Sequence, residues 1–220
     1  MYEFFRYFSY TTIIVLLFGC AIGFFCFPRG RSVNRWLILY LVAGLTSELV
    51  FRYFGSISAQ RYNLFVVPFF AITELIIFSA IYYLHLLKRS PKVFLLGLFG
   101  AMLIIMDILF LSQLFVIEQY QTYSKVISDF LIIVYCLLYY RQLLKTNEPN
   151  AFYLKLNAGV LSYFVINLLI FSSLNFLVNE SINLVIVFWV LNVVASSAFY
   201  LFLTYQIWQH GKIRKPLQYG

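Results

Sequence analysis

Four carboxylates lie inside apolar stretches that are each long enough to form a helix. They are Glu48, Glu74, Asp107 and Asp129. A charged side chain at the centre of a bilayer costs about 2.5–3.5 kcal/mol on insertion scales, so acids in such positions usually serve a function. An ionised carboxylate there needs a cation as its partner, whereas a protonated one can bridge two helices through a hydrogen bond. The four acids are therefore the first candidates for a binding site.

Two amides, Asn167 and Asn192, fall at a depth similar to that of the acids. Counting about 1.5 Å of rise per residue from the ends of the apolar stretches places these polar side chains in the central to outer part of the membrane. This agreement in depth predicts one polar cavity in the outer half. The predicted ligand-binding residues are Glu48, Glu74, Asp107, Asp129, Asn167 and Asn192. The alternative for the two asparagines is hydrogen bonding between neighbouring helices.

Glu74 is the predicted centre of this cavity, because no basic residue lies near it in the sequence. Glu48 precedes Arg52 by four residues, which is the favourable order for an ion pair along a helix. A structural pair is the alternative to a ligand-binding role for Glu48. Pro68 lies inside an apolar stretch and is expected to bend the helix that carries Glu74, which would give a ligand a way in.

The other acids are assigned roles around Glu74. Asp107 and Asn192 are its predicted partners, because Asp107 would be costly if it faced lipid and should point inward. Asp129 is expected nearer the mouth of the cavity, or simply beside water at the outer surface. We therefore predict that Glu74 faces the interior of the bundle.

Signatures of catalysis, metal binding and cofactor binding are not found. The sequence has no HExxH, GxSxG or phosphate-binding loop, and only two histidines, His85 and His210. A zinc site built from histidines is therefore not expected. Acid pairs inside a membrane can carry out hydrolysis, so an enzyme stays an alternative. No catalytic residue, metal or cofactor is predicted.

The composition is that of a polytopic membrane protein. Of the 220 residues, 63% are hydrophobic, 21% aromatic and only 11% charged, against about 45–50% apolar and about 25% charged in soluble domains. Apolar stretches near the length of a membrane helix recur along the chain. They are Tyr7–Phe27, Trp36–Phe54, Leu64–Leu87, Val93–Ile117, Tyr123–Leu144, Phe152–Leu177 and Ile182–Trp208. The predicted fold is an all-α bundle of seven transmembrane helices.

The basic residues are distributed unevenly between the predicted loops. Twelve fall on one side of the membrane: Arg29, Arg31, Arg35, Lys88, Arg89, Lys92, Arg141, Lys145, Lys155, Lys212, Arg214 and Lys215. The other side has Arg6, Arg52, Arg61 and Lys125. Cytoplasmic loops carry the excess of Lys and Arg, so the N-terminus is predicted outside and the C-terminus in the cytoplasm. The charge is then topological, and nucleic acid is not an expected partner.

The chain reads as a single transmembrane domain over residues 1–210, followed by a short basic cytoplasmic tail over 211–220. This tail is too short for an output domain, so any signalling is expected to pass through a partner protein. Gly19 and Gly23 form a small-xxx-small motif. It predicts close packing within the bundle or, alternatively, a homodimer. Cys20, Cys26 and Cys136 lie inside helices and are expected to be packing residues without a disulfide.

The pattern of polar residues resembles the small seven-helix integral membrane proteins of Bacteroidota-type bacteria, a family without an established activity. The residues that carry the resemblance are Glu48, Asn63, Glu74, Tyr82, Tyr83, Tyr163, Asn167, Asn192 and Tyr200. The resemblance spans most of the chain and implies a multi-pass protein of the bacterial inner (cytoplasmic) membrane. Some members lie near signalling genes, which favours sensing.

Several functions remain open from the sequence. The first is a receptor-like or accessory sensor protein that binds a small ligand in the outer cavity, with a cationic ligand as one candidate, and acts through a partner. The second is a proton- or cation-coupled transporter or channel, which the buried acids suit. No internal repeat is seen, and this weakens the transporter hypothesis. A subunit of a larger membrane complex is a further alternative.

Overall fold

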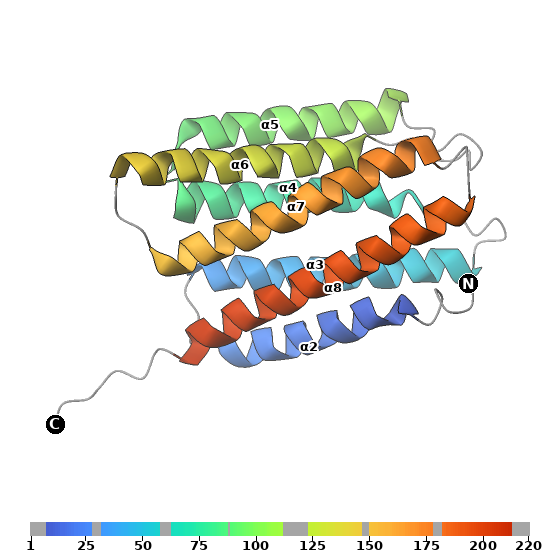
Figure 1. The fold of residues 1–220 in the computed structure, drawn as a ribbon, viewed down its shortest axis with the longest axis horizontal. Coiled ribbons are helices and arrows are strands. Elements are labelled where there is room, and N and C mark those ends of the chain that lie inside the picture. The colour runs from blue at the N-terminus through green and yellow to red at the C-terminus, as the bar shows by residue number, and fades with distance from the viewer. Residues whose placement is uncertain are drawn as a thin grey trace.

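The computed structural model describes residues 8–27, 32–57, 63–87, 89–111, 123–146, 150–177 and 182–212. Within these residues the chain forms seven helices and no strand (Figure 1). They are α2 (Tyr10–Cys26), α3 (Ser32–Ile57), α4 (Val66–Ile81), α5 (Pro91–Met106), α6 (Ser124–Thr146), α7 (Ala151–Leu177) and α8 (Ile182–Lys212). Short π-helical segments continue α4 and α5, namely η2 (Tyr82–Leu86) and η3 (Asp107–Leu111). The ends of the expected apolar stretches at Tyr7 and at 112–117 lie outside the described residues.

The helices lie side by side and alternate in direction, so the bundle has two distinct ends (Figure 1). We call the end where α2, α4 and α8 begin the Asn63 end, and the end where α3, α5 and α7 begin the Lys92 end. Six helices are long and apolar enough to cross a membrane. The 17 residues of α2 are also apolar but span only about 25 Å, less than the hydrocarbon core of about 30 Å. The described part of the chain thus forms a helical membrane bundle with six long spans.

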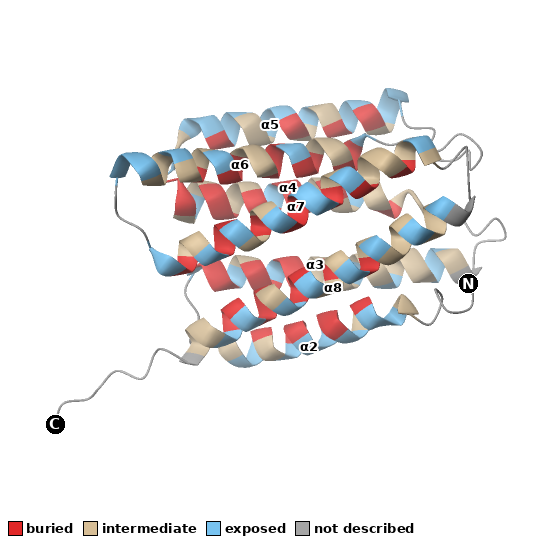
Figure 2. Ribbon diagram, in the orientation of Figure 1, coloured by how far each residue is buried: buried red, intermediate tan, exposed pale blue. Residues whose placement is uncertain are grey.

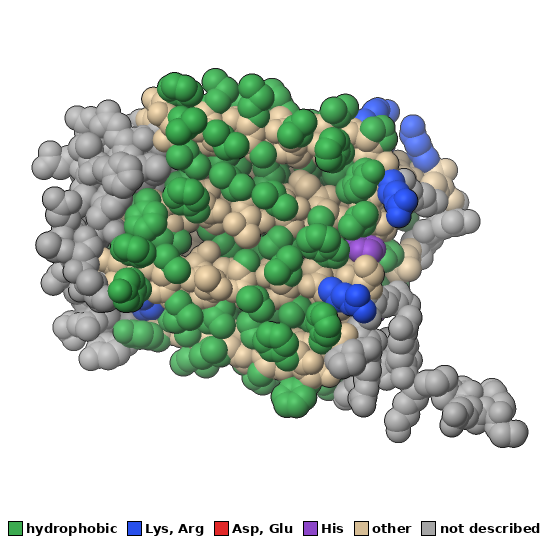
Figure 3. All heavy atoms as spheres, turned by 180° about the vertical axis from the view of Figure 1, so that it is seen from behind, with side chains coloured by type: hydrophobic (Ala, Val, Ile, Leu, Met, Phe, Trp, Pro, Cys, Tyr) green, Lys and Arg blue, Asp and Glu red, His purple; other side chains and the backbone are tan. Residues whose placement is uncertain are grey.

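Side-chain exposure follows the same architecture. Apolar side chains such as Phe25, Phe110 and Leu169 are exposed along the flanks of the bundle, and buried residues line its interior (Figure 2). A space-filling view shows hydrophobic side chains covering the flank, with Lys and Arg gathered at one end (Figure 3). An apolar flank between polar ends is the surface expected for contact with lipid.

Helix starts follow from local sequence. Asn150 accepts hydrogen bonds at its Oδ1 from the backbone N–H of Phe152 at 3.1 Å, which caps α7. Pro91 is the first residue of α5, where its missing N–H is not needed. Pro68 is the third residue of α4, and a first-turn N–H likewise has no partner within the helix. The expected bend at Pro68 is therefore wrong, since the proline lies in the first turn of α4.

The two small residues of α2 are used inside the bundle. An added Cβ at Gly19 would lie 2.6 Å from Thr204 Oγ1 of α8, and one at Gly23 would lie 2.9 Å from Ile38 Cγ1 of α3. Both glycines are buried, so close approach of α2 to its neighbours requires residues without a side chain. The packing alternative for this motif is confirmed, and the homodimer through Gly19 and Gly23 is not supported, because this face is already covered.

Aromatic rings form a layer across the middle of the bundle. Phe78 of α4 lies edge-on to Tyr40 of α3 and to Phe164 of α7, in each case with 5.0 Å between ring centroids. Tyr163 of α7 and Phe199 of α8 stack at 4.1 Å. Phe78, Phe164 and Phe199 are each at most 4% exposed. This aromatic layer separates the polar residues described next from the Lys92 half.

Candidate ligand-binding site

Lys125 lies in the interior of the bundle and not at its surface. Its side chain is 3% exposed, although the sequence places it among the charges of the outer loops. The reason is the position of α6, which begins at Ser124 and stops short of the ends of α5 and α7 at the Asn63 end (Figure 1). Lys125 is therefore a buried charged residue of this region that was not identified from the sequence.

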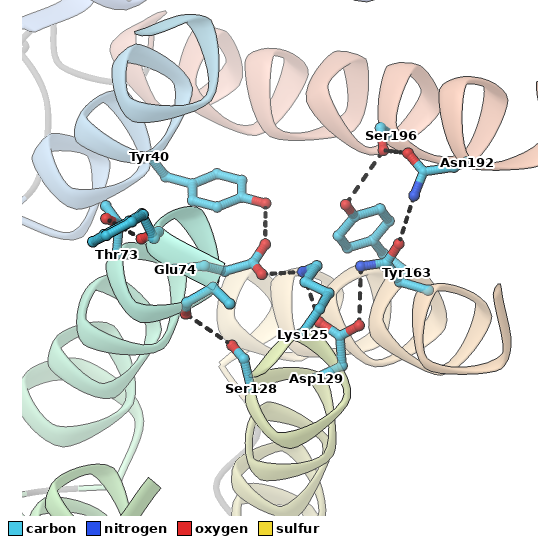
Figure 4. A network of polar contacts seen from close by, with 12 residues as sticks. Tyr40, Thr73, Glu74, Lys125, Ser128, Asp129, Tyr163, Asn192 and Ser196 are labelled. Atoms are coloured by element: carbon cyan, nitrogen blue, oxygen red, sulfur yellow. Dashed lines mark hydrogen bonds and ion pairs between the residues drawn. The ribbon is translucent and has the colours of Figure 1, made fainter. Parts of the chain in front are cut away.

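Lys125 forms ion pairs with two carboxylates, one on its own helix and one on α4 (Figure 4). Its Nζ donates to Asp129 Oδ1 at 2.7 Å, one turn along α6, and to Glu74 Oε2 of α4. Glu74 and Asp129 are both 0% exposed. Glu74 thus faces the interior as predicted, and its basic partner comes from a distant part of the sequence, 51 residues away. We call Glu74, Lys125 and Asp129 the triad.

Neutral donors complete the hydrogen bonding of the triad. The Tyr40 hydroxyl donates to Glu74 Oε1 at 2.7 Å, and Asn167 Nδ2 donates to Asp129 Oδ2 at 3.1 Å. Each carboxylate therefore accepts one bond from the ammonium and one from a neutral group. Hydrogen bonds to charged acceptors contribute about 1.5–3 kcal/mol each. These donors stabilise the two buried carboxylates.

A chain of amides and hydroxyls extends the network to α8 (Figure 4). Asn192 Nδ2 donates to Asn167 Oδ1 at 3.2 Å, and Ser196 Oγ donates to Asn192 Oδ1 at 3.3 Å. The hydroxyls of Ser196 and Tyr163 lie 3.4 Å apart. Asn192, a predicted partner of Glu74, is connected to it only through Asn167, Asp129 and Lys125. The asparagines also serve as the expected interhelical hydrogen-bonding groups.

Asp107 caps the start of α6, the helix that carries Lys125 and Asp129. Its Oδ2 accepts hydrogen bonds from the backbone N–H of Ser124 at 2.8 Å and of Tyr123 at 3.2 Å, and also from the Ser124 hydroxyl. These contacts cap the start of α6, where unpaired N–H groups favour a negative charge. Because Lys125 follows Ser124 directly, the cap fixes the position of the lysine. These contacts of Asp107, a predicted partner of Glu74, are with the start of α6.

Aromatic rings surround the ammonium group. Nζ of Lys125 lies 5.5 Å from the ring centroid of Phe164 and 5.9 Å from those of Phe70 and Phe171. A cation within about 6 Å of a ring face is attracted by the ring quadrupole. The rings also keep water from the ion pairs, which strengthens their electrostatic interaction.

The charges of the triad do not balance. Two carboxylates meet one ammonium, so the formal charge is one unit negative when all three groups are ionised. Taking charges out of water costs several kcal/mol per ion, which pairing offsets only with complete hydrogen bonding. The unmatched carboxylate is the feature of this site that a proton or another cation could neutralise.

A cavity of about 680 Å³ lies between the triad and the Asn63 end. Lys125, Asn167, Asn192, Ser196 and Tyr163 lie on its wall beside the triad. Nearer the mouth its wall includes Ser9, Glu48, Arg52, Gly55 and Asn63. Three of the predicted ligand-binding residues therefore line the cavity, namely Glu48, Asn167 and Asn192. The other three predicted residues, Glu74, Asp107 and Asp129, do not line the cavity. Lys125 separates the cavity from Glu74 and Asp129.

Glu48 and Arg52 form the expected pair on α3. Arg52 Nη2 lies 3.8 Å from Glu48 Oε2, and it donates to the Ser9 carbonyl at 2.5 Å. The guanidinium also lies over the Tyr10 ring at 4.4 Å. The structural pairing of Glu48 does not remove it from the cavity, since both members of the pair lie on the cavity wall.

Comparison of the chain with family models, curated proteins and solved structures gave no match. The described residues hold no cluster of three or more His, Cys, Asp or Glu side chains with the spacing of a metal site. The groups on hand are ion pairs, amides, hydroxyls and aromatic rings, which bind small polar molecules.

A second polar cluster lies on the other side of the aromatic layer. The Tyr82 hydroxyl donates to Asn157 Oδ1 at 2.7 Å and lies 3.0 Å from Cys136 Sγ. Asn157 Nδ2 donates to the Cys136 carbonyl at 3.4 Å. Tyr82 opens η2, where the wider π turn changes the facing of the residues that follow Ile81. This cluster joins α4, α6 and α7 and was not found from the sequence.

Proposed function

We propose that the protein is a receptor-like or accessory sensor protein of the membrane, in which a small molecule binds in the cavity at the Asn63 end and the change is passed to a partner protein. The observation that carries this proposal is the cavity wall formed by Lys125, Asn167 and Asn192. These three side chains belong to the hydrogen-bonded network of the triad. A ligand that contacts any of them changes the bonding of the whole network.

The network links most of the helices in the bundle. Tyr40 belongs to α3, Glu74 to α4, Lys125 to α6, Asn167 to α7 and Asn192 to α8. A ligand shifts a conformational equilibrium only by as much as its affinity differs between the two states. Competition by the ligand for the hydrogen bonds of Lys125 or Asn192 would supply such a difference. The helices would then move relative to one another.

The aromatic layer favours a receptor over an open channel. Phe78 follows Glu74 by one turn, and Phe199 follows Ser196 in the same direction along the bundle. Their rings are buried and in contact with their neighbours. Such a closed layer at the bottom of the cavity suits a molecule that binds and leaves by the same end.

A proton- or cation-coupled transporter is the second candidate. The unmatched carboxylate of the triad favours it, because ionisable groups inside membrane proteins are typical of proton relays and ion pathways. Protonation of Glu74 or Asp129 would leave a one-to-one ion pair with Lys125. Transport would require the cavity to open alternately toward the Lys92 end.

The proposed orientation places the Asn63 end outside the cell and the Lys92 end in the cytoplasm. Arg89 and the basic helix-end residues Lys92, Arg141 and Lys155 lie toward the Lys92 end, and cytoplasmic loops and their flanks carry the excess of positive charge. The proposed location is the inner membrane of a bacterium, in line with the family resemblance described above. A reporter that is active only in the periplasm should be silent when fused after Gly220, and an active fusion would contradict this orientation.

Thiol labelling tests the cavity and separates the two functions. Ser196 lines the cavity, whereas Ser197 of the same helix is not among its wall residues. We expect Ser196→Cys, in a Cys26→Ala background, to react with a membrane-impermeant methanethiosulfonate added from the Asn63 end. Ser197→Cys is the matched control and should react much more slowly.

The side from which the label arrives decides the outcome. Labelling of Ser196→Cys in vesicles of one orientation only supports the receptor. Labelling in both right-side-out and inside-out vesicles supports a transporter with alternating access. If the cysteine is labelled in neither, the cavity is not accessible, and the proposed binding function is wrong.

A further inference from the structure

We infer that the ligand of the cavity is a small zwitterion that carries an ammonium and a carboxylate group, of the amino acid type. This inference rests on the proposed binding function of the cavity and specifies its ligand. It follows from hydrogen-bonding groups on the cavity wall that lack partners, and from the charges around them.

Two buried donors on the wall have no hydrogen-bond partner within the described part of the chain. They are Thr12 Oγ1 and Arg52 Nε. Thr12 is only 2% exposed. The Arg52 side chain is 24% exposed, but its guanidinium is held by the Ser9 carbonyl and the Tyr10 ring, and its Nε is buried. A buried donor without an acceptor is unfavourable. Both groups therefore suit an acceptor supplied by a ligand in the cavity.

Lys125 supplies a third donor to the cavity. An ammonium group has three N–H bonds, and two of them are directed at Glu74 and Asp129. No third acceptor is found for Lys125 among the described residues, and the lysine lies on the cavity wall. Cationic donors form short, strong hydrogen bonds with carboxylates. A ligand carboxylate could accept a hydrogen bond from Arg52, Thr12 or Lys125, each of which lies on the cavity wall.

Glu48 supplies the opposite charge. Its carboxylate is one-third exposed and lines the cavity, and the guanidinium of Arg52 is 3.8 Å away, beyond hydrogen-bond range. Glu48 can therefore accept hydrogen bonds from a ligand ammonium. Among the described residues of the cavity wall, Glu48 is the one with a carboxylate side chain.

A zwitterion fits the charges on the cavity wall better than a simple ion does, although a simple cation would balance the net charge. Glu48, Glu74 and Asp129 face Arg52 and Lys125, which leaves a formal charge of one unit negative. A simple anion would double this imbalance in a poorly solvated site, where it costs most. A simple cation would meet Arg52 and Lys125 on the cavity wall. A zwitterion adds no net charge and satisfies both the donors and Glu48.

The rest of the wall suits an apolar side group. Trp189 lies 6.2 Å from the ring of Phe51 and 6.1 Å from that of Phe171, and all three line the cavity. The cavity volume of about 680 Å³ is within the range of small-molecule sites, about 300–1,000 Å³. A hydrophobic or aromatic amino acid matches this combination of charges and rings.

Titration calorimetry of the full chain in detergent tests the inference with a matched series of probes. The probes are L-phenylalanine, 2-phenylethylamine, 3-phenylpropionate and 2-phenylethanol, which share one apolar body and differ in charge. Glycine and L-leucine vary the apolar body of the zwitterion. We expect L-phenylalanine to bind at least tenfold more tightly than each of the two singly charged analogues.

Two variants assign each charged group of the ligand to its partner. Thr12→Val keeps the shape of the side chain and removes the hydroxyl, so it should weaken L-phenylalanine and 3-phenylpropionate by about tenfold and leave 2-phenylethylamine unchanged. Glu48→Gln should weaken L-phenylalanine and 2-phenylethylamine and leave 3-phenylpropionate unchanged. Thr46→Val is the control, since the Thr46 hydroxyl bonds to its own helix and lies off the cavity wall.

Three results would contradict the proposal that the ligand is a zwitterion. The first is a singly charged analogue that binds as tightly as L-phenylalanine. The second is 2-phenylethanol binding equally well, which would leave the cavity as a binding site for a neutral molecule. The third is that no zwitterion binds, in which case the labelling of Ser196→Cys still decides separately whether the cavity is accessible.

Discussion

Lys125 and Glu74 are 51 residues apart in the chain and form an ion pair from which solvent is almost fully excluded. The pair brings the first turn of α6 against the middle of α4. Asp129 completes it from the next turn of α6 at 2.7 Å. The two carboxylates are fully buried, so the geometry and the charge balance of the pair together determine how much it stabilises the fold.

The first prediction concerns the cation of the triad. Lys125→Met should leave Glu74 and Asp129 facing each other without a counter-charge. Removing one partner of a buried ion pair typically costs about 3–5 kcal/mol, so the melting temperature in detergent should fall markedly. Lys155→Met is the matched control, because Lys155 is exposed on α7 and its loss should change the melting temperature little. Equal melting temperatures for the two variants would contradict the structural role of the triad.

The second prediction concerns the carboxylates taken singly. Glu74→Gln and Asp129→Asn each leave one carboxylate for one ammonium, and the new amide oxygen can still accept a hydrogen bond from Lys125. Both variants should therefore be far more stable than Lys125→Met. Adding both amide substitutions to Lys125→Met should recover part of the lost stability, since no unpaired charge then remains. A thermal denaturation series of the four variants measures this, and a Glu74→Gln protein as unstable as Lys125→Met would show that the charge count is not the cause.

The sequence predicted the acids of the site better than its lysine. A spacing of four residues identified the Glu48–Arg52 pair, and the structure confirms it. The same spacing joins Lys125 and Asp129, but Lys125 was counted among the loop charges because an apolar stretch does not reveal how deep in the bundle a helix begins. The start of α6 depends on a tertiary contact, the cap that Asp107 provides. Periodicity and composition describe single helices and carry no information on such a contact.

The membrane bundle itself was predictable from composition, since long apolar stretches have few alternatives in structure. Which faces of the helices meet was not. The depth of Asn167 and Asn192 predicted their proximity, and the structure confirms that they are hydrogen bonded. Thr12, in contrast, carries no signal in the sequence, because its importance comes from lying on a cavity wall without a partner.

The third prediction tests how α2 packs. Gly19→Leu should place side-chain atoms against Thr204 and Leu41, which lie 2.6 and 3.2 Å from an added Cβ. Overpacking of this kind costs about 1–3 kcal/mol, so the melting temperature should fall. Ala21→Leu is the matched control, because Ala21 is exposed on the same helix and should tolerate the larger side chain. The oligomeric state from light scattering should be the same for both variants and the wild type, and a change caused by Gly19→Leu alone would restore the dimer hypothesis.

The last prediction concerns the polar cluster below the aromatic layer. Tyr82→Phe removes the hydroxyl that donates to Asn157 Oδ1 at 2.7 Å and leaves a buried amide oxygen without that donor. A buried acceptor left unsatisfied costs about 1–3 kcal/mol. We expect a lower melting temperature and faster reaction of Cys136 with a small thiol reagent, because the Tyr82 hydroxyl covers its sulfur at 3.0 Å. Tyr83→Phe changes the neighbouring residue, which is only partly buried, and should affect neither measurement. If the two variants behave alike, the contact between η2 and α7 does not hold this half of the bundle together, and the Tyr82–Asn157 bond is incidental to the packing of the helices.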